Sequence, residues 1–329
     1  MEHGGDLTEA IARNGGDPSD WLDLSTGINP WPWDGLKELP ANVWCRLPSL
    51  ADQEAAMFAA RKAYAVPRNA CVAAAAGTQT LIQWIPHLAP PGPVAILAPT
   101  YAEHETAWRR AGRETIAVSN IADVPAHARN VVVVNPNNPD GRIIGSHSLE
   151  QLAARLDSRG GWLIVDEAFA DVDPAISVVG MSDERPAVIL RSFGKFYGLA
   201  GVRLGFAVGR RDIVERIAAS VGPWPVSGPA LHIGTAALRD EQWAADTRAK
   251  LVRKAQDLDR VLVAAGLRIV GGTSLFRLAA CSDAVALHAQ LARRHVWCRR
   301  FDWSGEYLRF GLASNDGLDR LATALRLIE

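Results

Sequence analysis

The chain contains the stretch Ala187-Val188-Ile189-Leu190-Arg191-Ser192-Phe193-Gly194-Lys195, in which an apolar run ends in a short polar segment with a lysine. The apolar run is typical of a strand that is buried on both faces of a parallel sheet. Lys195 is one of five lysines, and the other four fall in predicted loops or on solvated helix faces. A lysine whose sequence neighbours are small and partly apolar suits Schiff-base chemistry, because a desolvated amine loses its proton more readily and becomes a nucleophile.

The alternation of apolar runs and helical stretches extends in both directions from this segment. Continuous apolar strands separated by helices favour an α/β domain with a mostly parallel sheet and helices on both faces. The predicted strands are 94–97, 115–118, 131–135, 162–166, 187–192 and 203–209, and the predicted helices are 102–111, 146–159 and 212–220.

The C-terminal third of the chain has a different pattern. Three prolines at positions 223, 225 and 229 precede long helical stretches at 230–238 and 241–265. Two short strands, a helix at 284–294 and a strand at 307–311 follow. We expect an N-terminal arm of residues 1–30, a large domain of residues 31–220 and a smaller α+β domain of residues 221–329.

Composition argues against several classes of function. The formal net charge is −1 and no basic run is interleaved with aromatic residues, so we expect no nucleic-acid partner. The apolar runs are far shorter than the roughly 20 residues that a membrane-spanning helix needs, and the N-terminus does not resemble a signal peptide. Four cysteines without paired spacing (45, 71, 281 and 298) favour reduced thiols in the cytoplasm over a metal site or a disulfide framework.

Polar residues stand where several predicted strands end. Asp166 and Ser192 close two of the strands, and Asn135 closes a third. Tyr101 comes soon after the strand 94–97, and Gly77-Thr78-Gln79 follows a short apolar run and opens a helix. Because open α/β sheets bind ligands beyond the carboxyl ends of their strands, these groups predict a single site.

The ordered set of motifs resembles the fold-type I aminotransferase family, whose enzymes use pyridoxal phosphate. The resemblance covers nearly the whole chain and implies an aspartate-aminotransferase-like fold, a cofactor-binding large domain and a homodimer. It rests on Gly77-Thr78-Gln79, Tyr101, Asn137-Asn138-Pro139-Asp140-Gly141, Asp166-Glu167-Ala168-Phe169, Ser192-Phe193-Gly194-Lys195 and Arg203.

The resemblance implies a role for each residue around the cofactor ring. Lys195 would hold the cofactor through a Schiff base and later move a proton at the substrate Cα. Asp166 would pair with the pyridine nitrogen and keep it protonated, so that the ring accepts electrons. Asn138 would donate to the ring hydroxyl oxygen, and Tyr101 would stack on the ring.

The resemblance also implies two anion sites. The backbone of Gly77 and Thr78, at a helix N-terminus, would bind the cofactor phosphate together with Ser192 and Arg203. Arg309 would bind the substrate α-carboxylate, because its planar guanidinium can donate two parallel hydrogen bonds.

The N-terminal segment carries a narrower resemblance. His3-Gly4-Gly5-Asp6 and the run from Trp21 to Pro30 are similar to the branch of this family that decarboxylates threonine phosphate in cobalamin biosynthesis. The similarity implies that His3 lies near the substrate phosphate, with Gly27 and Asn29 beside the carboxylate, so that the arm contributes to the substrate site.

Three positions bear on this assignment. Phe169 stands where histidinol-phosphate aminotransferases usually have tyrosine, so it favours the decarboxylase branch. Leu47 occupies the position of a tyrosine that, in many relatives, reaches the cofactor phosphate of a neighbouring subunit. Arg142 follows the Asp140-Gly141 turn and is a further candidate for the substrate phosphate.

The resemblance therefore implies decarboxylation of L-threonine O-3-phosphate, with pyridoxal phosphate as cofactor and a small phosphorylated amino acid as substrate. Transamination, most simply of histidinol phosphate, is the main alternative. It uses most of the same residues, because the outcome depends on which bond at Cα stands perpendicular to the cofactor ring. A pyridoxal-binding regulator is a third possibility, but the chain lacks the basic footprint of a DNA-binding module.

Overall fold

The computed structural model describes residues 4–35 and 38–328 of the chain. These residues form two compact units. The terminal unit contains the residues up to Pro32, the turn Pro139–Gly141 and the residues from Ala245 onward. The central unit contains Trp33–Asn138 and Arg142–Ala244. The three-part division expected at residues 30/31 and 220/221 stays a prediction.

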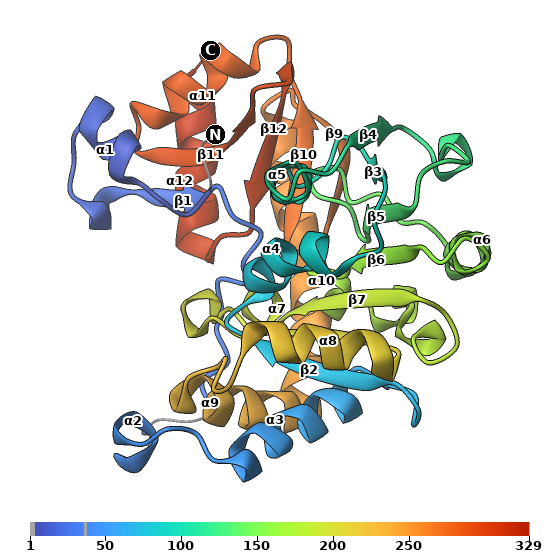
Figure 1. Ribbon diagram of the computed structural model, residues 1–329. Helices are drawn as coiled ribbons and strands as arrows, with labels where there is room; N and C mark the ends of the chain where they lie inside the picture. The colour runs from blue at the N-terminus through green and yellow to red at the C-terminus, as the bar shows by residue number, and fades with distance from the viewer. Residues whose placement is uncertain (1–3, 36–37, 329) are drawn as a thin grey trace. The chain divides into compact units, whose positions relative to one another are not determined.

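A seven-stranded sheet is the framework of the central unit (Figure 1). Its strands are β2 (Cys71–Ala75), β3 (Val94–Leu97), β4 (Thr115–Val118), β5 (Asn130–Val134), β6 (Trp162–Asp166), β7 (Ala187–Ser192) and β8 (Gly205–Gly209). In space the strands follow the order β2-β8-β7-β6-β5-β3-β4. Strands β4, β3, β5, β6 and β7 run parallel, whereas β8 is antiparallel to both of its neighbours. The mostly parallel sheet predicted from the continuous apolar runs is confirmed.

Helices lie on both faces of this sheet, as the alternation of side chains along each strand requires. The helices of the unit are α2 (Asn42–Cys45), α3 (Leu50–Ala63), α4 (Thr78–Leu88), α5 (Glu103–Arg110), α6 (Ser146–Asp157), α7 (Phe193–Phe196), α8 (Arg211–Val221) and α9 (Gly228–Arg239). On β5, Val132 points to the face covered by α4, α5 and α8. Its neighbours Val131 and Val133 point to the face covered by α6.

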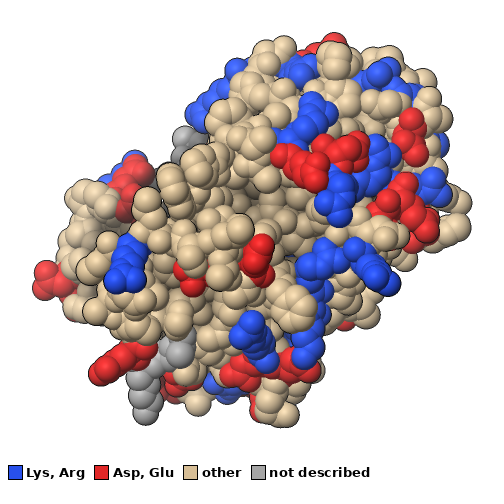
Figure 2. Space-filling model, turned by 60° about the horizontal axis from the view of Figure 1, so that its bottom comes forward, with Lys and Arg blue, Asp and Glu red and all other residues tan. Residues whose placement is uncertain are grey.

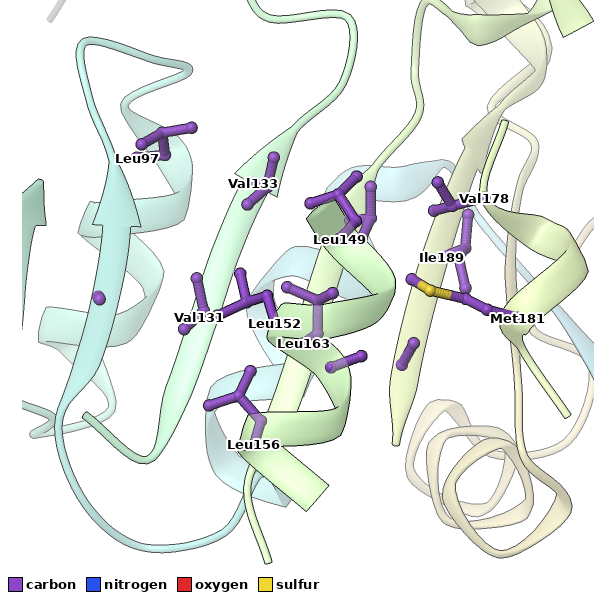
Figure 3. Packing of buried hydrophobic residues seen from close by; sticks show 14 of the residues in the cluster. Leu97, Val131, Val133, Leu149, Leu152, Leu156, Leu163, Val178, Met181 and Ile189 are labelled. Atoms are coloured by element: carbon purple, nitrogen blue, oxygen red, sulfur yellow. The ribbon is translucent and has the colours of Figure 1, made fainter. Parts of the chain in front are cut away.

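Helix α6 shows how sequence spacing produces this packing. Its buried Leu149, Leu152 and Leu156 are three and four residues apart, so they form one apolar stripe. Figure 3 shows these leucines over Val131, Val133 and Leu163 of the sheet. Strands that are covered in this way on both faces hold the residues at their carboxyl ends rigidly.

The terminal unit is built around a five-stranded sheet with the order β1-β11-β12-β10-β9. Its elements are α1 (Thr8–Asn14), β1 (Leu22–Leu24), the part of α10 (Glu241–Ala264) from residue 245 onward, β9 (Arg268–Thr273), β10 (Phe276–Ala280), α11 (Ala284–Ala292), β11 (Val296–Phe301), β12 (Ser304–Gly311) and α12 (Asn315–Arg326). Strand β1 pairs in parallel with β11, and the other neighbours are antiparallel. The sequence reasoning missed both β1 and β11.

One predicted strand begins later than expected. The strand predicted at 203–209 starts at Gly205, because Arg203 has a φ of 56°, in the left-handed region that interrupts an extended chain. In the described part of the chain, no helix has the length and apolar character needed to cross a membrane. Figure 2 shows acidic and basic side chains interspersed over one face of the molecule, with uncharged areas between them.

Candidate functional site

Four of the predicted cofactor residues come together where α4 begins. Ser192 lies opposite Gly205 in the register of β7 and β8. Gly205 packs closely on the start of the helix, since a Cβ at this position would lie 2.5 Å from the amide nitrogen of Thr78. The guanidinium of Arg203 lies beside Gly77, where a Cβ would approach Nη2 to 2.8 Å. The N-terminus of an 11-residue helix, a hydroxyl and a guanidinium form a donor set that fits a phosphate group.

Backbone conformation explains why glycine precedes this helix. Gly77 has a φ of 79°, which glycine adopts without a steric penalty, and it leads directly into Thr78, the first residue of α4. A side chain at this position would be strained and would also displace the Arg203 guanidinium. The predicted helix start after Gly77 is confirmed.

Asp166 is a buried carboxylate with two polar contacts. It is only 3% exposed. Its Oδ2 lies 2.9 Å from Nε2 of His104, and its Oδ1 accepts a hydrogen bond of 3.0 Å from the amide of Ala168. Burial of a charged carboxylate is costly unless such partners compensate it. A carboxylate that is buried and held in one orientation fits a protonated pyridine nitrogen.

Tyr101 connects the start of α4 with the start of α5. Its hydroxyl donates to Oε1 of Gln79 at 3.3 Å, and Nε2 of Gln79 donates to Oε2 of Glu103 at 2.9 Å. The Tyr101 ring also meets the His104 ring edge to face, with 6.2 Å between centroids. Through these contacts one set of side chains joins the start of α4 to Asp166.

Asn138 is placed by its neighbour Asn137. Oδ1 of Asn137 accepts a hydrogen bond of 2.6 Å from the hydroxyl of Thr100, and its Nδ2 donates to the carbonyl of Pro99 at 3.0 Å. These bonds tie the loop after β5 to the loop that carries Tyr101. The sequence identified the Asn-Asn motif, but only the fold shows that Asn137 fastens the two loops together.

Lys195 lies on the short helix α7, directly after β7. Its Nζ is 6.0 Å from the centroid of the buried Phe169 ring. On the same segment, Phe193 stacks on Tyr197 with 4.6 Å between centroids, and Tyr197 stacks on Trp243 at 5.5 Å. This aromatic packing fixes the backbone on both sides of the lysine.

Arg309, on β12, is the centre of an anion-binding candidate in the terminal unit. It is 6% exposed, and its Nη2 donates to the carbonyl of Ser25 at 2.7 Å. It lies opposite Arg299 in the register of β11 and β12. Burial, and then the positive charge of Arg299, lower the pKa of Arg309 to about 10. An anion bound beside these two arginines would relieve that unfavourable charge.

Arg299 is a candidate that the sequence reasoning missed. It belongs to β11, a strand that was not predicted because two adjacent arginines interrupt its apolar alternation. A second arginine ten residues before Arg309 was the available signal. This signal indicates a joint role only when the hairpin of β11 and β12 is known to place Arg299 opposite Arg309.

The N-terminal residues contact Ser25, whose carbonyl accepts the hydrogen bond from Arg309. The amide of Gly5 donates to the Ser25 hydroxyl at 2.8 Å, and Gly4 packs so closely that a Cβ would lie 2.5 Å from the Ser25 carbonyl oxygen. Gly27 is buried, and Asn29, 2% exposed, accepts a hydrogen bond of 3.0 Å from the amide of Trp31. His3 lies outside the described residues.

Arg142 has a contact of its own within the central unit. Its Nη1 donates to the carbonyl of Ser119, the residue after β4, at 3.2 Å. This bond holds part of the guanidinium against the end of an edge strand, and the role of Arg142 toward a substrate phosphate stays a prediction.

The central unit thus contains a helix start whose donors fit a phosphate, a buried carboxylate and a lysine that follows a buried strand. This donor set fits pyridoxal phosphate, and with the sheet order it defines an enzyme of the fold-type I pyridoxal-phosphate class. The chain belongs to the aminotransferase class I and II family, whose profile matches residues 45–325.

Two relatives match nearly the full chain. A threonine-phosphate decarboxylase from a Sinorhizobium species is 43% identical over 99% of this chain and 98% of its own length. A threonine-phosphate decarboxylase from Pseudomonas aeruginosa is 42% identical over 96% of this chain and 94% of its own. The crystal structure of a histidinol-phosphate aminotransferase from Clostridium acetobutylicum has a TM-score of 0.82 at 19% identity, over 93% of this chain and 98% of that one. The last comparison shows the fold alone.

Proposed function

We propose that this protein decarboxylates L-threonine O-3-phosphate with pyridoxal phosphate as cofactor. The product is (R)-1-aminopropan-2-yl phosphate, a building block for the side chain of cobalamin. The observation that carries the proposal is the similarity, over nearly the full length, to two threonine-phosphate decarboxylases. The fold does not separate decarboxylation from transamination, because a histidinol-phosphate aminotransferase shares it.

The arginine pair of the terminal unit supports this choice of substrate. Threonine phosphate carries a carboxylate and a phosphate, and Arg299 and Arg309 lie opposite each other on adjacent strands. We assign the carboxylate to Arg309, together with Gly27 and Asn29, because a buried guanidinium binds a planar carboxylate through two parallel hydrogen bonds. Arg299 and His3 are then the candidates for the substrate phosphate.

The residues of the central unit would hold the cofactor and move one proton. When bound, pyridoxal phosphate supplies an electron sink for the bond that breaks at Cα. Asp166 stabilises the protonated pyridine nitrogen, and Tyr101 and Asn138 orient the ring. Gly77, Thr78, Ser192 and Arg203 bind the phosphate. As CO2 leaves the substrate, the protonated amine of Lys195 would donate a proton to Cα and would regain one from solvent, so that one CO2 and one amine form from each substrate.

The decisive experiment supplies threonine phosphate and pyridoxal phosphate in the absence of any 2-oxo acid. We expect equal amounts of CO2 and aminopropanol phosphate, identified by mass spectrometry. An enzyme that forms no CO2 and turns over only with a 2-oxo acid acceptor is a transaminase, and the proposal is then wrong. Histidinol phosphate with 2-oxoglutarate is the matched test of the aminotransferase alternative.

A homodimer in the cytoplasm is the remaining part of the proposal. Large apolar side chains on and around α2 and α3 are exposed, among them Trp44 (66%), Leu47 (67%), Leu50 (69%) and Phe58 (66%). Large patches of exposed apolar side chains mark interaction surfaces, and a second copy of the chain is the occupant that the family implies. Sedimentation velocity should give a dimer that Leu47→Asp weakens, while Val252→Asp, at an exposed position of α10, leaves it intact.

A further inference from the structure

The strands that carry Asp166 and Ser192 also carry a charged cluster on the reverse face of the sheet. Strands β6 and β7 are parallel, with Asp166 opposite Leu190. Side chains alternate between faces, so Asp166 and Ser192 share one face, and Glu167 and Arg191 share the other. The contacts agree, since Asp166 meets His104 of α5, whereas Glu167 meets Val178. Figure 3 shows Val178 and Ile189 on this reverse face.

Arg191 is the centre of this cluster. Its Nη1 lies 2.6 Å from Oε2 of Glu167, and its Nη2 lies 2.6 Å from Oδ1 of Asp171. Tyr64 completes the enclosure, because the guanidinium carbon lies 4.3 Å from the centroid of its ring. The side chains of the three charged residues are between 0% and 5% exposed.

Glu167 connects Arg191 to the backbone through hydrogen bonds. Its Oε1 accepts a hydrogen bond of 2.6 Å from the amide of Val178, and its Oε2 accepts one of 2.6 Å from the hydroxyl of Ser177. Its own amide donates to the carbonyl of Leu190 at 2.9 Å, so the ladder between β6 and β7 continues past Asp166. The guanidinium fork therefore spans the point where both strands end.

The electrostatics show that the cluster is held together by its charges. Burial alone would lower the pKa of Arg191, but Asp171 and then Glu167 outweigh burial, and the pKa is raised. A rigid fork with fixed donors meets two carboxylates at set positions, which the flexible ammonium of lysine cannot reproduce. The neighbours of Asp166 and Ser192 along the chain are thereby fixed from behind.

We propose that Arg191 is a positioning residue for the cofactor site: by clamping Glu167 and Asp171 it fixes the strand ends that carry Asp166, Ser192 and, three residues further on, Lys195. This inference rests on the pyridoxal-phosphate part of the proposed function and not on the substrate. Arg191 touches neither cofactor nor substrate in this role. It acts through the backbone of β6 and β7.

Two variants test the role without relying on an unpaired buried charge. Arg191→Lys keeps the charge and removes the fork. The triple variant Glu167→Gln, Asp171→Asn, Arg191→Met replaces all three charged side chains together by neutral ones of similar size, so that no buried charge is left without a counter-charge. The matched control is Arg210→Lys, because Arg210 forms a similar fork with Asp212 at a partly exposed site.

The first readout is the dissociation constant of pyridoxal phosphate, measured by titrating the apoprotein with the cofactor. The second is the absorbance maximum of the bound cofactor and the change of that absorbance with pH. The third is the urea midpoint of the apoprotein. We expect Arg191→Lys and the triple variant to raise the dissociation constant at least tenfold and to alter the pH titration, while the triple variant keeps the urea midpoint of the wild type. Arg210→Lys should change none of them. If the triple variant or Arg191→Lys folds like the wild type and also binds the cofactor with wild-type affinity and spectrum, the cluster is merely structural and the proposal is overturned.

These readouts need no substrate, so they separate this inference from the proposed reaction. A wild-type protein that binds pyridoxal phosphate but does not decarboxylate threonine phosphate contradicts the substrate assignment, and the variants still decide the role of Arg191. A wild-type protein that does not bind the cofactor is visible before any variant is made, and that result overturns both.

Discussion

Two buried arginines, one in each unit, differ in the direction in which their surroundings move the pKa. Arg191 in the central unit lies between Glu167 and Asp171, and its pKa is raised. Arg309 in the terminal unit lies opposite Arg299, and burial followed by that like charge lowers its pKa to about 10. The first arginine is stabilised by the folded protein itself. The second is buried beside a like charge, and in the proposed function an anionic group of the substrate would offset that charge.

The largest expected effect tests where the chemistry resides. Lys195→Ala should abolish turnover and the visible absorbance of the lysine-bound cofactor, because no other group would replace the amine at Cα. Lys62→Ala, at an exposed lysine, is the matched control and should behave like the wild type. Borohydride trapping followed by peptide mapping should locate the cofactor on Lys195. An adduct on another lysine would contradict the role assigned to Lys195.

The parts of the fold that follow from sequence are those in which burial alone determines the pattern. Strands such as 131–134 and 162–166 are covered on both faces, so they appear as unbroken apolar runs, and their end residues could be predicted with them. Strands β1 and β11 gave no such signal. These two strands pair although they lie more than 270 positions apart in the chain, with Leu22 opposite Val296. Each is therefore defined by its partner strand and not by an apolar pattern of its own.

The same distinction applies to the site. Asp166 and Ser192 were predicted because each closes a strand, and Lys195 because it follows one, and the sequence marks both kinds of position. Contacts between distant positions were not, since His104 meets Asp166 across 62 positions and Asn137 meets Thr100 across 37. Residues that hold the predicted ones in place therefore emerge only from the folded arrangement.

The second effect concerns substrate binding at Arg309. Arg309→Gln should lower kcat/KM for threonine phosphate by roughly 100-fold, because a buried charged hydrogen-bond pair with the carboxylate is lost. The affinity for pyridoxal phosphate should stay unchanged. Arg300→Gln, on the same strand as Arg299 but in a partly exposed position, is the control and should have little effect. If both variants lose kcat/KM equally, Arg309 does not bind the substrate carboxylate.

The third effect compares the stability that each arginine contributes. In the apoprotein, Arg191→Met should lower the free energy of unfolding by about 3–5 kcal/mol, because it leaves two carboxylates buried together. Arg309→Met should lower it by less than about 1 kcal/mol, or raise it, because it removes one of two neighbouring like charges. Urea titrations of the two variants measure the difference directly. Similar losses in both would show that the pKa directions do not distinguish a structural arginine from a binding one.

The smallest effect extends the comparison to His288 in the terminal unit, where burial is again the main cause of a lowered pKa. Its Nε2 is 3.2 Å from the carbonyl oxygen of Cys298, and burial lowers its pKa from 6.5 to about 4. Between these pH values the unfolded chain therefore binds a proton at His288 that the folded protein does not. The contribution of His288 to the free energy of unfolding is fully present above pH 6.5 and is lost as the pH is lowered toward 4. The contribution of this one residue is about 3 kcal/mol at most. His288→Gln removes the titrating group and keeps a hydrogen-bond donor for the carbonyl. As the pH falls below 6.5, the wild type should therefore lose free energy of unfolding relative to the variant. A difference that does not change with pH would mean that His288 is as easily protonated in the folded protein as in the unfolded chain.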